Sequence, residues 1–292
     1  RDVERSRGLG DVYKRQGLSK GHKRIADFIK NNYEKASFMT AAKLGKTVGV
    51  SESTVVRFAS HVGFDGYPEL QKHLQELVKS HLTSVQRMEV AANRMGGDDI
   101  INDAFAADAE MLKRTREGVS REDFFGSVAA INKAHKIYVL GSRSSASLAS
   151  FAAFYLNYLC DNVVLIDTSS TSEMFEQMFR ISEQDVCIAI SFPRYSNQTI
   201  NALSFAKSRG ATIISITDGE MSPIAQYATY LLVAESSMVS FVDSLVAPLS
   251  LINALIAACA KENDGHVCEN LGELEKIWDK YHVYRTDKEE QE

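Results

Sequence analysis

Apolar residues recur with two different periods along the chain. Between residues 18 and 118 they return every three or four positions, which predicts amphipathic α-helices. From residue 119 onward, short apolar runs alternate with helical patterns. The predicted strands are 136–141, 162–167, 186–191, 212–217 and 230–235. Such alternation is typical of a parallel sheet that is covered by helices on both faces.

We therefore expect an α + α/β protein, in which a small helical domain precedes a doubly wound, flavodoxin-type parallel sheet. The expected parts are an extension at 1–16, a helical domain at 17–80, a helical linker at 81–118, a sheet domain at 119–262 and a C-terminal helix and tail at 263–292. Residues 1–16 follow neither period, so we expect them to be non-native or disordered.

The segment from residue 40 to residue 61 predicts two short helices that are joined by a tight turn. Thr40 and Ser51 are the expected N-caps, because a hydroxyl can accept from the first free amides of each helix. Gly49 can supply the positive φ of the turn. This arrangement predicts a helix-turn-helix.

The second of these helices has the residues that a DNA-reading helix needs. Ser53, Thr54 and Arg57 lie on the side opposite the apolar positions. Short hydroxyl side chains let the backbone approach the major groove, and arginine reaches a phosphate or a guanine edge. The alternative is an ordinary helical hairpin with a solvated polar face.

The charge is distributed unevenly along the chain. Residues 17–80 hold ten basic and six acidic side chains, whereas residues 81–292 hold 18 basic and 29 acidic ones; the total net charge is −5. A basic small domain joined to an acidic larger one favours polyanion binding by the small domain.

Polar residues follow two of the predicted strands, each time directly before a helix. The first set is Ser142, Arg143, Ser144 and Ser145, and the second includes Ser191, Arg194 and Ser196. Ligands of such folds bind at the carboxyl ends of the strands. Helix N-termini and arginine forks bind anions, so these turns predict a phosphate-type site.

The run AAKLGKTVGVSESTVVRFASHVGFDGYPELQKHL resembles the RpiR/MurR family of bacterial transcription regulators, and the resemblance covers about residues 18–79. It implies a recognition helix with Ser51, Ser53, Thr54 and Arg57 at the DNA. Lys43, Lys46 and Tyr67 are the further candidates for phosphate contacts. A partner of this kind is double-stranded operator DNA.

Residues 121–260 resemble the SIS, or sugar isomerase, phosphosugar-binding domain. Gly141 and Ser145 keep the ends of the family's G-x-G-x-S motif, but Arg143 replaces its second glycine. In the S-x-S-G-x-T motif, Ser191 is kept and Ser196 stands for the threonine, whereas Pro193 and Arg194 replace the Ser-Gly pair. The resemblance implies a small anionic sugar-derived effector, and the departures leave a carboxylate ligand nearly as plausible as a phosphosugar.

Two other function classes stay open on the sequence. A sugar-phosphate isomerase or deaminase needs an acid–base residue, for which Glu173, Glu235 and His135 are candidates by residue type only. A protein adaptor would bind no DNA. No acid–base pair lies in a recognisable motif, and the positions of the recognition-helix pattern carry the expected residues. We therefore favour a non-enzymatic regulator without cofactor or metal.

The remaining features are consistent with a cytoplasmic regulator. The four cysteines (Cys160, Cys187, Cys259 and Cys268) form no C-x-x-C pair and are expected to be reduced. No apolar run reaches the length that spans a bilayer. A single recognition helix contacts too few bases to select an operator, so we expect a homodimer or homotetramer.

Overall fold

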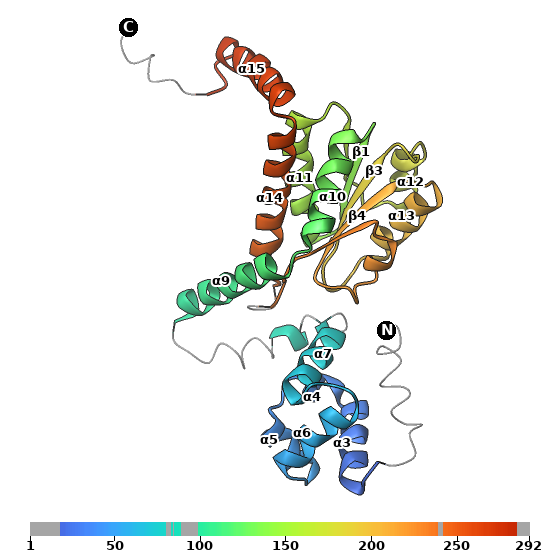
Figure 1. The fold of residues 1–292 in the computed structure, drawn as a ribbon, viewed down its shortest axis with the longest axis vertical. Helices are drawn as coiled ribbons and strands as arrows, with labels where there is room; N and C mark the ends of the chain where they lie inside the picture. The colour runs from blue at the N-terminus through green and yellow to red at the C-terminus, as the bar shows by residue number, and fades with distance from the viewer. Residues whose placement is uncertain (1–17, 80–82, 84, 89–98, 239–241, 285–292) are drawn as a thin grey trace. The chain divides into compact units, whose positions relative to one another are not determined.

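The computed structural model describes residues 18–79, 83, 85–88, 99–238 and 242–284. The chain divides into two compact units, Arg1–Gln86 and Arg87–Glu292, hereafter the N-terminal and the C-terminal unit (Figure 1). None of the described helices is long and apolar enough to cross a membrane.

The described part of the N-terminal unit is helical. Its helices are α3 (Lys20–Asn31), α4 (Tyr33–Ser37), α5 (Ala41–Val48), α6 (Glu52–His61) and α7 (Tyr67–Lys79). Their apolar faces meet in one core, whose fully buried members include Ile25, Ile29, Leu44, Val55, Phe58 and Leu70. The short helix α4 was not predicted, because one helical turn is too short to show a period.

The start of α5 and the turn after it have the predicted chemistry. The Thr40 hydroxyl accepts from the Lys43 amide at 3.2 Å, and Gly49 has φ of 70°. Gly45 makes a second contribution that the sequence analysis did not identify. A Cβ at Gly45 would lie 2.9 Å from the carbonyl oxygen of Val50, so only glycine lets the turn pack this closely on α5.

The C-terminal unit is built on a five-stranded parallel sheet in the order β2-β1-β3-β4-β5. The strands are β1 (Ile137–Gly141), β2 (Val163–Ile166), β3 (Val186–Ile190), β4 (Thr212–Thr217) and β5 (Tyr230–Val233). This is the flavodoxin-like order, and its topological switch point lies between β1 and β3. The predicted doubly wound sheet is therefore confirmed.

Helices cover both faces of this sheet (Figure 1). On one face, α10 (Arg121–Lys133), α11 (Ser144–Leu159) and α14 (Val246–Glu262) form a core with alternate strand residues. On the other face, α12 (Thr171–Met178) and α13 (Asn197–Ser208) pack on the intervening residues. Between β4 and β5 the helical segment is only the 3-10 turn η2 (Ala225–Tyr227), because Pro223 and the short spacing leave room for a single turn.

Two helices flank this layered core. Helix α9 (Ile100–Gly118), which occupies the expected linker, buries Met111 and Thr115 against the C-terminal unit. Helix α15 (Asp264–Lys280) places Trp278 edge-on to Tyr158, with ring centroids 6.4 Å apart. Helix α15 is only partly packed, because its Ile277 is 49% exposed.

Candidate functional site

Helix α6 presents a polar face to solvent. Ser53, Val56, Arg57 and Ser60 are exposed at spacings of three and four residues, whereas Val55, Phe58 and Ala59 are buried. Val56 is 40% exposed and was not identified from the sequence. An exposed aliphatic group on a groove-reading helix can contact the thymine methyl group. The available sequence signal for Val56 was its position among the polar residues of the same helix face.

Hydroxyl groups organise the start of α6. The Ser51 hydroxyl accepts from the Thr54 amide at 3.3 Å and lies 2.9 Å from the Ser53 hydroxyl and 2.8 Å from the Thr54 hydroxyl. Thr54 is half-buried, whereas Ser53 and Arg57 are exposed. Ser51 thus holds the helix end, and Ser53 and Arg57 remain accessible to a ligand.

The predicted phosphate contacts have different environments. Lys43 and Lys46 are exposed on α5. Tyr67, in contrast, is 3% exposed, and its hydroxyl donates to the carbonyl oxygen of Met39 at 2.7 Å. The expectation that Tyr67 contacts phosphate is therefore wrong: α7 turns this ring into the core. Burial raises the pKa of Tyr67 to about 12.

The His22 ring on α3 lies beside α6. The His22 ring lies 5.6 Å from the Phe58 ring and 5.4 Å from the His61 ring. Burial, followed by the charges of His61 and Arg57, lowers the pKa of His22. The position of His22 at this helix thus disfavours its protonated form.

In the C-terminal unit, the loops after β1 and β3 meet at the carboxyl edge of the sheet. The Ser142 hydroxyl lies 3.3 Å from the hydroxyl of Thr199, a buried residue in the first turn of α13. Gly141 lets α11 start against the strand end, because a Cβ there would lie 2.4 Å from the Ser145 carbonyl oxygen. Thr199 was missed because it lies inside the helix, beyond the motif.

The backbones of Arg143 and Arg194 have positive φ angles, which are common for glycine and rare for arginine. Their φ angles are 59° and 66°, and both side chains are exposed. Of the described residues other than glycine, only these two and His282 have positive φ. Both arginines occupy positions at which the SIS motifs have glycine. The positive φ that suits glycine is therefore kept at these positions, although each residue carries a bulky side chain. Each such residue costs about 1–3 kcal/mol of strain.

Helix N-termini at this edge differ in how they are capped. Ser170 caps α12 by accepting from the Glu173 amide at 3.4 Å. By contrast, neither Arg143 before α11 nor Ser196 before α13 makes a side-chain cap hydrogen bond. No side chain therefore occupies the N-termini of these two helices, which follow neighbouring strands, although the Ser145 and Ala146 amides of α11 donate to the Ser142 and Arg143 carbonyl oxygens.

The other predicted site residues lie at the same edge of the sheet and differ in their exposure. Ser144 is exposed and Ser196 is half-buried, whereas Ser145 and Ser191 are 3% and 4% exposed. The loop after β3 is held by Tyr195, whose hydroxyl donates to Asp218 after β4 at 2.7 Å. This contact was not predicted, because it joins two loops that are distant in sequence.

The candidate acid–base residues do not gather in one place. His135 precedes β1, so it lies at the amino edge of the sheet, where its Nδ1 is 3.5 Å from Asp185. The Glu173 carboxylate accepts from the Thr168 hydroxyl at 2.5 Å. Glu235 follows the edge strand β5.

The cysteines behave as ordinary thiols. All four are free, and burial raises the pKa of Cys187 to about 12. Cys187 is fully buried, whereas Cys160 is only partly buried. Within the described ranges, no group of three or more His, Cys, Asp or Glu residues is placed to hold a metal ion.

Comparisons with known proteins agree with this two-part organisation. Residues 12–81 match the helix-turn-helix domain of the rpiR family, and residues 130–258 match the SIS domain. An uncharacterised HTH-type transcriptional regulator of Haemophilus influenzae is 30% identical over 230 residues, which cover 77% of each chain. The chain belongs to the rpiR family of HTH-type transcriptional regulators.

Two solved structures share the fold. The sugar isomerase domain of the RpiR transcription factor from Sphaerobacter thermophilus has 28% identity and a TM-score of 0.56, covering 59% of this chain and 96% of that chain. NanR of Vibrio vulnificus, solved in complex with ManNAc-6P, has 20% identity and a TM-score of 0.59, covering 95% of this chain and 98% of that chain.

Proposed function

We propose that this rpiR-type regulator reads operator DNA with the exposed face of α6. We further propose that it senses an anionic sugar derivative at the carboxyl ends of β1 and β3. The observation that carries the effector proposal is the pair of uncapped helix N-termini, α11 and α13, each beside an arginine of positive φ. DNA binding places the protein in the cytoplasm. It acts as a homo-oligomer and performs no catalysis on its effector.

The DNA proposal rests on the residues that α6 leaves exposed. Ser53 and Arg57 are one helical turn apart, and the Arg57 Nε donates to the Ser53 carbonyl at 3.3 Å. This contact holds the arginine stem along the helix and leaves the terminal nitrogens for a base edge or a phosphate. Lys43 and Lys46 add exposed cations on α5.

The DNA test uses a duplex that the wild-type protein selects from a random pool, with affinity measured by fluorescence anisotropy at several salt concentrations. Arg57→Ala should weaken binding by about 1–3 kcal/mol, roughly 5- to 150-fold. Lys43→Ala should reduce the salt slope by about 0.9. Lys133→Ala, which removes an equal charge from the C-terminal unit, should change neither value. Unchanged binding of Arg57→Ala would refute α6 as the reading helix.

The effector proposal rests on charge and on geometry. Two helix N-termini without a side-chain cap favour an anion, and two guanidinium groups at the same edge can bind phosphate or carboxylate in bidentate fashion. Arg143 and Arg194 keep strained backbones that a glycine would relieve. ManNAc-6P in the similarly folded NanR supports a sugar phosphate as the first choice.

Thermal unfolding of the full chain against sugar phosphates, sugar acids and inorganic phosphate tests this site. A ligand at 100 times its Kd stabilises by about 2.7 kcal/mol, which raises the Tm by roughly 5–11 °C for a unit of this size. Ser196→Ala should lose most of this shift, because its hydroxyl has no capping role. Ser208→Ala, at the other end of α13, is the matched control. If both variants kept the wild-type shift, the ligand would bind elsewhere.

The non-enzymatic proposal has its own test. His135 lies at the amino edge, so it cannot act as a base for a ligand at the carboxyl edge. We expect no isomerisation or deamination of any sugar phosphate that raises the Tm. Turnover that Glu173→Gln abolishes would overturn this part of the proposal and leave the DNA part intact.

A further inference from the structure

Helix α3 packs along one side of α6, next to the exposed face of that helix. A Cβ at Gly21 would lie 3.3 Å from the Thr54 methyl carbon, so the first turn of α3 reaches the start of α6. One residue later, the His22 ring lies 5.6 Å from the Phe58 ring and 5.4 Å from the His61 ring. Thr54, Phe58 and His61 are spaced as i, i+4 and i+7, so they form one stripe along α6 that α3 covers.

His61 differs from the other members of this stripe in its exposure. Phe58 is 2% exposed and Thr54 is half-buried, whereas His61 is exposed. His61 also lies four residues after Arg57, one turn further along the same side of α6. It therefore belongs both to the contact with α3 and to the exposed face for which we propose DNA binding.

The length of α6 places His61 at the edge of a DNA groove. Ser53 and His61 are eight residues apart. That spacing is about 12 Å along a helix axis, and the major groove is also about 12 Å wide. Recognition helices contact base edges with their N-terminal residues. A helix that places Ser53 at the bases therefore brings His61 toward the sugar-phosphate backbone beside the groove.

Without DNA, the surroundings of the His22–His61 pair disfavour a proton. Burial, followed by the charges of His61 and Arg57, lowers the pKa of His22. Helices α3 and α5 together carry six lysine and arginine residues and the single acid Asp27. Helices α4 and α7 have equal numbers of basic and acidic residues, and the other acids around the pair are Glu34, Glu52, Asp65, Glu69 and Glu76. A DNA phosphate at His61 would supply negative charge directly beside the two rings.

We propose that His61 contacts a DNA phosphate and that operator binding draws a proton onto the His22–His61 pair. The contact requires α6 to lie in the major groove, so it rests on the proposed function. A phosphate beside the pair favours its charged form. By linkage, the affinity for DNA then rises as the pH falls through the titration range of histidine. DNA binding by the N-terminal unit thus responds to pH.

Fluorescence anisotropy of the full chain with the duplex selected from the random pool tests this contact at pH 7.5 and pH 6.0. Wild-type affinity should be about 3- to 10-fold higher at pH 6.0, and the salt slope should steepen by up to about 0.9. His61→Asn cannot gain the charge, so its affinity should hardly change with pH. His61→Lys is charged at both pH values and should bind at pH 7.5 as tightly as the wild type does at pH 6.0.

His73→Asn is the matched control in the same unit. The His73 ring on α7 packs on the Phe64 ring, with centroids 5.3 Å apart, and its substitution should keep the wild-type pH response. Three results would overturn the proposal. They are a wild-type affinity that ignores pH, a His61→Asn protein with the wild-type response, and loss of the response in His73→Asn alone.

Arg57→Ala distinguishes a failure of this proposal from a failure of the proposed function. If α6 reads DNA but His61 takes up no proton, Arg57→Ala weakens binding at both pH values while the wild-type affinity ignores pH. If α6 does not read DNA, Arg57→Ala leaves the affinity unchanged at both pH values.

Discussion

Replacing Tyr67 with phenylalanine distinguishes a core tyrosine from a phosphate contact. The substitution removes one hydroxyl, which donates to the Met39 carbonyl oxygen at 2.7 Å, and keeps the buried ring. The same carbonyl oxygen accepts from the Gln71 side-chain amide at 2.9 Å, so it retains a partner. The cost is therefore that of one neutral hydrogen bond, about 1 kcal/mol, without the further penalty of an unsatisfied acceptor.

Amide hydrogen exchange measures this cost in the whole protein. A loss of about 1 kcal/mol should speed exchange of the most protected amides in α4 and α7 roughly fivefold. Exchange in the C-terminal sheet should stay unchanged and is the internal control. DNA affinity and its salt dependence should match the wild type, because a buried hydroxyl contacts no phosphate. Normal protection together with a fivefold or larger loss of DNA affinity would refute this reasoning.

Three further predictions concern the strand ends and the helical unit. Gly141→Ala should lower the Tm of the C-terminal unit by several degrees, since its Cβ would meet the Ser145 carbonyl oxygen at 2.4 Å and overpacking costs about 1–3 kcal/mol. Arg194→Gly should raise the Tm by relieving a φ of 66° while it weakens anion binding; calorimetry with and without ligand tests both effects. The pKa of His22 is lowered in the folded chain, so its contribution to stability is present above the ordinary value of 6.5 and is lost as the pH falls below it. Denaturant titrations between pH 7.5 and 5.5 should show this loss in the N-terminal unit, and His22→Asn should reduce it.

Local sequence signals predicted most of the fold. The alternation of strand and helix patterns fixed the order of elements from β1 to β5, and hydroxyl caps at Thr40 and Ser51 marked the starts of α5 and α6. Signals of this kind depend on residues within one turn or one strand, so they can be read without the fold.

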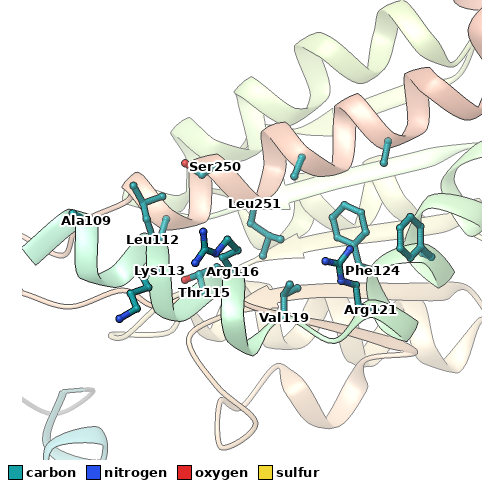
Figure 2. A pocket seen from close by; sticks show the side chains of 14 residues that line it. Ala109, Leu112, Lys113, Thr115, Arg116, Val119, Arg121, Phe124, Ser250 and Leu251 are labelled. Atoms are coloured by element: carbon teal, nitrogen blue, oxygen red, sulfur yellow. The ribbon is translucent and has the colours of Figure 1, made fainter.

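Features that depend on packing between distant segments were not predicted. Tyr67 was misassigned because its burial depends on Met39, 28 residues earlier. The contact between Ser142 and Thr199 joins the loop after β1 to the first turn of α13, 57 residues later. A cavity of about 740 Å³ lies between α9, α10 and α14 (Figure 2), and no single stretch of sequence indicates it, because all three helices line it.

The positive φ angles of Arg143 and Arg194 have an evolutionary consequence. Arginine and glycine codons can differ by a single base. One base change at either position can therefore replace the arginine with glycine and relieve the backbone strain. Laboratory selection for heat resistance in the absence of metabolite should therefore converge on glycine there. We expect the survivors to keep their fold and their DNA binding but to lose their response to the proposed effector.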